Sequence, residues 1–217
     1  MIQLHFDPGT AAMIPHIVLE ELGVPYERVS VSRATNEHKQ PAYLRLNPNG
    51  LIPVLVDGEL VLYETAAIVL HLVDTHPQAG LAPALGTPQR AHCYKWLAWL
   101  TNTLQATLLA YFYPERWVDE GNAAGAAQVK AHAEQRIAGL LAQLDGELAR
   151  HGQAWFGGAD YSVLDPYVFT LCRWTRNFRQ SRPAREYQHL GPYLQRMLAR
   201  PAVQRVLANE RLSPPFV

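Results

Sequence analysis

The sequence predicts an α/β domain followed by an all-α domain. Strand signals are confined to roughly the first 76 residues, and a stretch rich in glycine and proline begins at His76-Pro77. Beyond that stretch, apolar residues recur only at helical spacing. We therefore expect domains over residues 1–78 and 88–217 with a linker over 79–87, and 217 residues leave ample length to bury a core.

The first domain shows an ordered series of short elements. The expected series is a strand at Ile2–Phe6, a turn at Asp7–Gly9, a helix at Ala11–Leu22 ending at Gly23, a strand at Val29–Val31 and a helical turn at Tyr43–Leu46. Asp57-Gly58 then predicts a tight hairpin between Val54–Val56 and Leu60–Leu62. With a third helix after the hairpin, this β-α-β-α-β-β-α order implies one sheet covered by helices, as in a thioredoxin-like domain.

Pro53 stands at the start of an apolar strand, where a proline cannot donate to the sheet. One resolution of this conflict is a cis peptide bond between Ile52 and Pro53. It would turn the backbone of Ile52 outward, with its N–H and C=O offered to an extended ligand. The sequence therefore predicts a peptide-like ligand beside this strand.

The third helix is expected over Ala66–Asp74, with Thr65 as its N-cap. A helix N-terminus attracts anions because its first N–H groups are unpaired. A free amino-acid carboxylate could bind the N–H and hydroxyl of Thr65, and Glu64 could pair with the ammonium of the same ligand.

The second domain carries helical patterns. Trp96, Leu100, Leu104 and Leu108 recur every four residues, and a second apolar face runs from Ile137 to Leu148. Ser162 and Asp165 have the spacing of a capping box ahead of another helix.

Composition excludes several classes of protein. Lys+Arg and Asp+Glu both number 19, which gives no basic field for nucleic acid. The N-terminus does not resemble a signal peptide and no apolar stretch approaches a membrane span, so we expect a cytoplasmic protein. Cys93 and Cys172 lie far apart without C-x-x-C spacing, which favours buried, inert thiols.

Pro53 after Ile52 and Glu64-Thr65 at the third helix together resemble the glutathione site of cytosolic glutathione transferases. The sequence, particularly PHIVLEELGVPYE at residues 15–27, is also similar to that of bacterial beta-class enzymes. The resemblance implies a thioredoxin-like domain plus a helical domain and detoxification by glutathione transfer. It further implies glutathione as cosubstrate, no metal, and a homodimer.

Such an enzyme must stabilise the glutathione thiolate, and a fall of about two units in the thiol pKa needs about 2.7 kcal/mol. The resemblance implies that the donor follows the first strand, where Thr10 is the only hydroxyl. Alternatively, Thr10 only caps the first helix. His5 and Tyr26 are weaker donor candidates, and Ala11 stands where beta-class relatives have a cysteine, which removes a mixed disulfide with glutathione.

The resemblance also implies which residues bind the other parts of the glutathione tripeptide. His38 and Lys39 would bind the glycine carboxylate, with Arg33 in reserve, unless they belong to an ordinary solvated loop. The implied glutathione-binding residues are Thr10, His38, Lys39, Ile52, Pro53, Glu64 and Thr65.

An aromatic cluster that includes Tyr113 suits a planar apolar electrophile, although such residues are often simple core. The expected pocket residues are Leu104, Leu108, Tyr111, Phe112 and Trp117. Three functions remain open: conjugation of glutathione to an electrophile, reduction of peroxides or disulfides through glutathione's own sulfur, and a non-enzymatic binding or scaffold role.

Overall fold

The computed structural model describes residues 1–217, which form two compact units. Unit 1 comprises Met1–Ala84 and Leu198–Pro214, and unit 2 comprises Leu85–Met197 and Pro215–Val217. The sequence placed the whole of 88–217 in the helical domain, whereas the structure groups 198–214 with the sheet.

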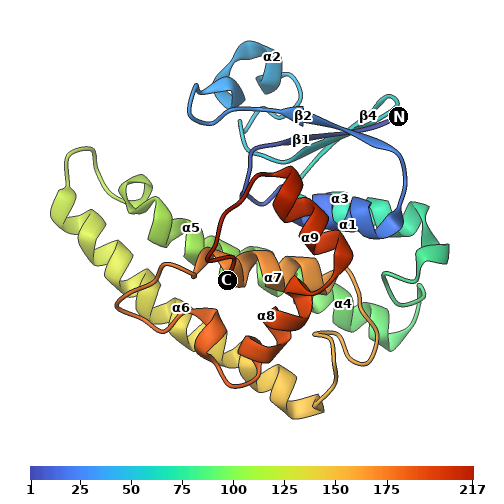
Figure 1. Cartoon of the computed structure of the whole chain (residues 1–217). Coiled ribbons are helices and arrows are strands. Elements are labelled where there is room, and N and C mark those ends of the chain that lie inside the picture. The colour runs from blue at the N-terminus through green and yellow to red at the C-terminus, as the bar shows by residue number, and fades with distance from the viewer. The chain divides into compact units, whose positions relative to one another are not determined.

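Unit 1 contains a mixed four-stranded sheet in the order β2-β1-β3-β4, in which only β1 and β2 pair in parallel. Its elements are β1 (Ile2–Phe6), α1 (Met13–Leu22), β2 (Tyr26–Ser30), α2 (Pro41–Leu44), β3 (Val54–Asp57), β4 (Leu60–Tyr63), α3 (Thr65–Thr75) and α9 (Pro201–Asn209). In Figure 1, α2 lies on one face of the sheet and α1, α3 and α9 lie on the other. This is the predicted thioredoxin-like arrangement.

The alternation of β1 decides which residues reach each face. Ile2, Leu4 and Phe6 are buried, and the Phe6 ring lies 6.1 Å from the ring of His16 in α1. His5 points the opposite way, with its ring 6.1 Å from Tyr43 of α2. The period of two in a strand therefore separates two apolar layers, one on each side of the sheet.

Before the hairpin, element boundaries differ from the expected ones at three places. The first helix begins at Met13 instead of Ala11, because residues before it form a turn. The second strand spans Tyr26–Ser30 and is mostly exposed, so it lacked the apolar alternation that marks a strand. The short second helix begins at Pro41, whose missing N–H is not needed in a first turn.

Unit 2 is helical, as predicted. Its helices are α4 (Pro88–Trp99), α5 (Ala106–Phe112), α6 (Ala123–His151), α7 (Leu164–Trp174) and α8 (Leu190–Leu198), the last of which ends at the boundary with unit 1.

A π-helical segment, Leu100–Gln105, joins α4 to α5. Strict spacing of four residues would turn an apolar face by about 40° per step on a regular α-helix. The wider π turn reduces this drift. Trp96, Leu100, Leu104 and Leu108 are consequently all buried, at 6%, 0%, 0% and 0% exposure.

The Ser162 and Asp165 side chains form the predicted bonds ahead of α7, although the helix begins at Leu164 with Val163, not Ser162, at its N-cap. Asp165 is fully buried and accepts N–H bonds from Phe156 and Ser162, both at 2.8 Å. The Tyr193 hydroxyl donates to the same carboxylate at 2.9 Å. Ser162 accepts the N–H of Leu164 at 3.3 Å. The side chains of this segment thus satisfy the start of α7 internally.

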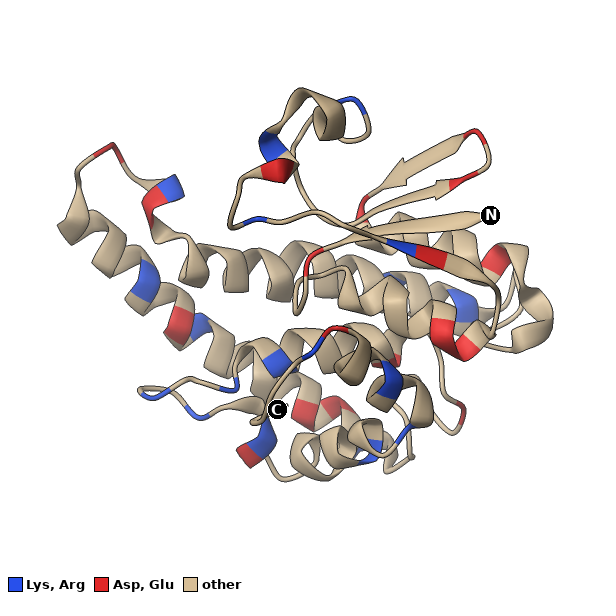
Figure 2. Cartoon of the chain, turned by 45° about the horizontal axis from the view of Figure 1, so that its top comes forward, with Lys and Arg blue, Asp and Glu red and all other residues tan.

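Surface charge and cysteines agree with the composition. Figure 2 shows acidic and basic residues mixed along both units. Cys93 and Cys172 are free and buried, and burial raises the pKa of the Cys172 thiol. That thiol therefore stays protonated and unreactive. None of the helices combines the length and apolar character needed to cross a membrane.

Candidate functional site

Four chain segments meet at one end of the sheet in unit 1. Val54 of β3 lies opposite both His5 of β1 and Tyr63 of β4. Because these pairs are antiparallel, the segments after β1, before β3 and after β4 leave the sheet at the same end. The parallel strand β2 pairs Ser30 with Phe6 and adds the loop that follows it. The register thereby gathers residues 7–10, 32–40, 52–53 and 64–65.

The Ile52–Pro53 peptide bond is cis, as the sequence predicted. The carbonyl of Leu51 accepts bonds from the Tyr43 hydroxyl at 2.8 Å and from Asn47 Nδ2 at 2.9 Å. These contacts fix the approach to the strand. Ile52 itself forms no backbone hydrogen bond in the sheet or in the turns around it. Its N–H and C=O are therefore free to pair with an extended ligand.

Helix α3 begins one residue earlier than predicted. Thr65 is its first helical residue, and Glu64 occupies the N-cap without a capping side chain. The expected N-cap role of Thr65 is therefore wrong, because the chain turns at Glu64, whose backbone has φ 72° and ψ 112°. A non-glycine residue with positive φ costs on the order of 1–3 kcal/mol and is typical of ligand clamps. Glu64 is exposed, and Thr65 is 7% exposed.

Thr10 lies in the turn between β1 and α1. Its hydroxyl donates to the carbonyl of Asp7 at 2.7 Å and accepts the N–H of Ala12 at 3.3 Å. The single hydroxyl proton is thus used inside the turn. The N–H of Ala11, the next residue, forms no hydrogen bond within the chain. The turn therefore presents two possible donors for an anion, a hydroxyl that must rotate and a backbone N–H that need not.

The cationic residues Arg33, His38 and Lys39 lie at the same end of the sheet. Lys39 Nζ donates to the carbonyl of Asn49 at 3.2 Å. Burial raises the pKa of the Asp7 carboxyl, while the charges of Arg33 and His38 oppose that rise. This interaction places both side chains near the turn that carries Thr10.

Tyr26 and His5 were the two weaker candidates for the thiol donor. The Tyr26 hydroxyl donates to Glu20 Oε1 at 2.6 Å, and Tyr26 pairs with Ile2 at the opposite end of β1. Burial lowers the pKa of His5, so this imidazole is neutral at pH 7. The position of Tyr26 therefore argues against that residue, whereas His5 remains a candidate as a neutral donor.

Sequence reasoning missed a buried polar pair beneath this turn. Glu210, which follows α9, accepts the N–H of Gly9 through Oε2 at 2.8 Å. Its other oxygen lies 2.7 Å from His16 Nδ1, and both side chains are 0% exposed. A histidine in the apolar face of the first helix was a possible signal, but its partner lies 194 positions later.

The expected pocket residues of unit 2 have different environments. Leu104 and Leu108 are fully buried, whereas Phe112 and Trp117 are 42% and 63% exposed. Tyr111 is half-buried, with its ring 4.5 Å from Phe178.

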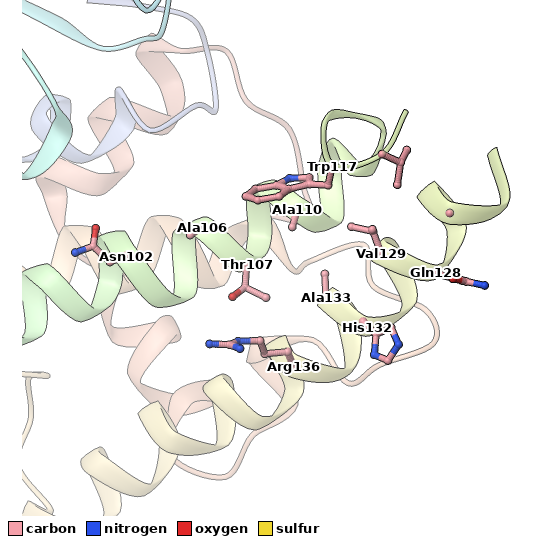
Figure 3. A pocket seen from close by; sticks show the side chains of 12 residues that line it. Asn102, Ala106, Thr107, Ala110, Trp117, Gln128, Val129, His132, Ala133 and Arg136 are labelled. Atoms are coloured by element: carbon pink, nitrogen blue, oxygen red, sulfur yellow. The ribbon is translucent and has the colours of Figure 1, made fainter. Parts of the chain in front are cut away.

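A cavity of about 580 Å³ in unit 2 includes one of these residues, Trp117. Figure 3 shows Trp117 from the segment after α5 and His132 and Arg136 from α6 around this cavity. Its lining residues are Asn102, Ala106, Thr107, Ala110, Trp117, Val118, Gly125, Gln128, Val129, His132, Ala133 and Arg136. The two buried leucines pack in the core and do not line it.

Comparison with known families and proteins agrees with this geometry. Residues 4–74 match the family model described as the N-terminal domain of glutathione S-transferase, and residues 100–201 match that of the C-terminal domain. The chain is 31% identical to glutathione S-transferase GST-4.5 of Xanthomonas campestris over 98% of this chain and 100% of the relative. It is 32% identical to GstB of Escherichia coli over 88% and 89% of the two chains.

Solved structures give the same result. A glutathione transferase homologue from Sulfitobacter with bound glutathione superposes with a TM-score of 0.88 at 28% identity, over 98% of this chain and 99% of that one. A beta-class glutathione S-transferase from Sphingomonas chungbukensis superposes with a TM-score of 0.82 at 30% identity, over 97% and 100%.

Proposed function

Because the chain belongs to the glutathione S-transferase family, we propose that it conjugates the glutathione thiolate to small hydrophobic electrophiles. The observation that carries this proposal is the convergence of four segments at one end of the sheet. Each segment supplies a group suited to a different part of a γ-Glu-Cys-Gly tripeptide. Membership of the family supports a transferase. That the electrophile is small and hydrophobic is our proposal.

The γ-glutamyl end binds at the start of α3. The exposed carboxylate of Glu64 pairs with the ligand ammonium, and the N–H and hydroxyl of Thr65 bind the α-carboxylate. Support comes from the open N-terminus of this helix, which has no capping side chain of its own. A ligand carboxylate would satisfy those N–H groups.

The cysteinyl and glycyl parts extend along the sheet edge. Ile52 pairs with the cysteinyl backbone through its free N–H and C=O, and Pro53 fixes that orientation. His38 and Lys39 bind the glycine carboxylate, with Arg33 as a third cation nearby. The position of Lys39 against Asn49, within the segment that leads to Ile52, supports this direction for the ligand.

Thr10 stabilises the thiolate. On binding, its hydroxyl proton turns from the Asp7 carbonyl to the sulfur, and the Ala11 N–H can add a second donor. One hydrogen bond to an anion contributes about 1.5–3 kcal/mol, which covers most of a fall of about two units in the thiol pKa. The thiolate then attacks an electrophilic carbon and forms a C–S bond, as halide departs from an aryl halide or as the π electron pair of an activated alkene moves onto its electron-withdrawing group and is later protonated by water.

For the electrophile we propose the aromatic region of unit 2, from Leu104 to Trp117. Its exposed members, Phe112 and Trp117, are the residues suited to contact a planar apolar substrate. We also propose that the protein is a cytoplasmic homodimer. Sedimentation of the purified protein tests the dimer.

Calorimetric titration with glutathione tests the core of the proposal. We expect a dissociation constant between micromolar and millimolar and thiolate absorbance of the complex near neutral pH. Binding without turnover of any aryl halide would contradict conjugation. Absence of binding at millimolar glutathione would instead support the scaffold alternative.

Reduction of peroxides or disulfides through glutathione's own sulfur is the second candidate. Ala11 at the position after Thr10 leaves no protein thiol in the turn, so glutathione must supply the sulfur in either reaction. Rates with an aryl halide and with an organic hydroperoxide at equal glutathione separate the two functions.

A further inference from the structure

Glu210 joins the end of α9 to the turn that carries Thr10. Its Oε2 accepts the Gly9 N–H at 2.8 Å, and its Oε1 lies 2.7 Å from His16 Nδ1. The residue is 3% exposed. His16 Nε2 is buried without a hydrogen-bond partner, so Glu210 makes the only polar contact of that ring. A buried carboxylate with both oxygens engaged holds its partners in one geometry.

Helix α9, which precedes Glu210, is itself bound to α1. Arg200, the N-cap residue of α9, binds the carboxylate of Glu21 in α1 through two bonds of 2.6 and 2.9 Å, and Arg205 of α9 binds Glu20 at 2.5 Å. At the end of α9 the Glu210 N–H donates to Val206, and the next turn closes with Leu212 bonded to Leu207, both at 2.9 Å. Glu210 therefore stands at the hydrogen-bonded end of a helix that two ion pairs join to α1.

The contact controls which donors the turn presents. Gly9 has φ 71°, a conformation that glycine tolerates, and its N–H is directed to Glu210. The Thr10 N–H bonds to Asp7, at 3.3 Å. The Ala11 N–H remains for a ligand, and the Thr10 hydroxyl can serve one only by rotating away from the Asp7 carbonyl. Loss of the Gly9 bond would let this peptide unit rotate and move both donors.

We propose that Glu210 is a positioning residue that holds the Pro8–Thr10 turn in the orientation that stabilises the glutathione thiolate. This inference rests on the proposed function, since it assigns a second role within the same site. It acts through geometry. By charge alone a nearby carboxylate would oppose formation of a thiolate, so its charge and its geometry have effects of opposite sign.

Two substitutions separate these effects. Glu210→Gln keeps an oxygen for Gly9 and a polar contact with His16, but removes the charge. Glu210→Ala removes both contacts. We expect the pKa of bound glutathione to rise by about one unit in Glu210→Ala, which is a tenfold fall in the ionisation constant of the bound thiol. In Glu210→Gln it should stay at the wild-type value or fall.

Amide hydrogen exchange gives a second readout that needs no glutathione. The Gly9 N–H should exchange at least about tenfold faster in Glu210→Ala than in wild type, because its acceptor is gone. Affinity for S-methylglutathione, which lacks the thiol proton, should change less than about twofold, because the groups that hold both ends of the tripeptide are intact.

Glu21→Ala is the matched control, because it breaks an α1–α9 ion pair without touching the turn. It should leave the bound thiol pKa and the Gly9 exchange unchanged. If Glu210→Ala does not fold, Glu210→Asp replaces it. That side chain is one methylene shorter, cannot reach Gly9 and His16 together, and should give an intermediate rise.

The result that overturns the inference is a wild-type thiol pKa and Gly9 exchange rate in Glu210→Ala or Glu210→Asp. An equal rise in Glu210→Gln and Glu210→Ala also overturns it, since the remaining hydrogen bonds would then not matter. A wild-type protein that gives no glutathione thiolate refutes the proposed function, a different outcome from an unchanged signal in the variants.

Discussion

The starts of α7 and α3 differ in how the unpaired N–H groups of the first helical turn are satisfied. At α7, Ser162 and the buried Asp165 satisfy the backbone of the first turn and of the preceding segment. At α3, Glu64 sits at the N-cap with positive φ and no capping bond. A helix end that the chain does not satisfy itself is available to water or a ligand. We call the start of α7 the closed start and expect it to contribute to stability. We call the start of α3 the open start and expect it to contribute to ligand binding.

The largest expected effect falls on the closed start. Asp165→Ala should destabilise the protein by about 3–5 kcal/mol, because it leaves the N–H groups of Phe156 and Ser162 and the Tyr193 hydroxyl without their buried acceptor. Denaturant unfolding measures this loss. Glutathione affinity of the folded fraction should not change. A loss below about 1 kcal/mol would mean that the two helix starts do not differ in this way.

The open start should give the reverse result. Glu64→Ala should weaken glutathione binding by about 2 kcal/mol or more, because the ligand ammonium loses its anion. Its free energy of unfolding should change by less than about 0.5 kcal/mol, since the side chain is exposed. Calorimetry and denaturant unfolding measure the two quantities.

Glu59→Ala is the control for that experiment. Glu59 is also exposed, but it lies in the hairpin turn at the other end of the sheet. Equal losses of affinity in the two variants would show a general effect of charge and would contradict a specific ammonium contact at Glu64.

A smaller effect is expected at the turn before α1, which is partly closed by Thr10. Thr10→Ala should raise the pKa of bound glutathione by about one to two units, and Thr10→Ser should not. Ultraviolet titration of the thiolate measures the shift. A rise below about 0.5 units would transfer the role to the Ala11 N–H and make this turn a backbone site like the start of α3.

The smallest effect is expected in unit 2. Trp117→Ala should raise the KM for an aryl halide by no more than about threefold, because the side chain is 63% exposed and loses little buried area. The affinity for glutathione should be unaffected. Steady-state kinetics with either substrate varied checks both statements, and a loss of a hundredfold would show that this residue dominates the pocket.

The same difference between backbone features and side-chain contacts explains which parts of the structure could be predicted from the sequence. The site in unit 1 depends on backbone features, and these leave marks in the sequence: a proline at Pro53, a hairpin dipeptide at Asp57-Gly58 and a polar pair at Glu64-Thr65. Each mark has a local physical cause, so the cis bond, the hairpin and the order of elements were predicted correctly. The N-cap at Thr65 was wrong because positive φ at Glu64 has no sequence signal in a non-glycine residue.

The sequence signals of a pocket lined by side chains are weaker. Leucine and aromatic residues at helical spacing fit both a core and a ligand site, and only burial separates Leu104 from Trp117. Contacts between distant positions leave none at all. The bond between Glu210 and Gly9 joins residues 201 positions apart, and no pattern in a single sequence relates them.

The grouping of Leu198–Pro214 with the sheet has a consequence for synthesis. During translation the strands and first helices emerge from the ribosome long before α9 does. The partner of His16 and Gly9 is then missing until unit 2 has been made. Domains generally fold in the order of synthesis, but this first unit is completed only by a late segment. A nascent chain halted before Leu198 would carry every tripeptide-binding residue proposed above, yet lack the carboxylate that orients its turn.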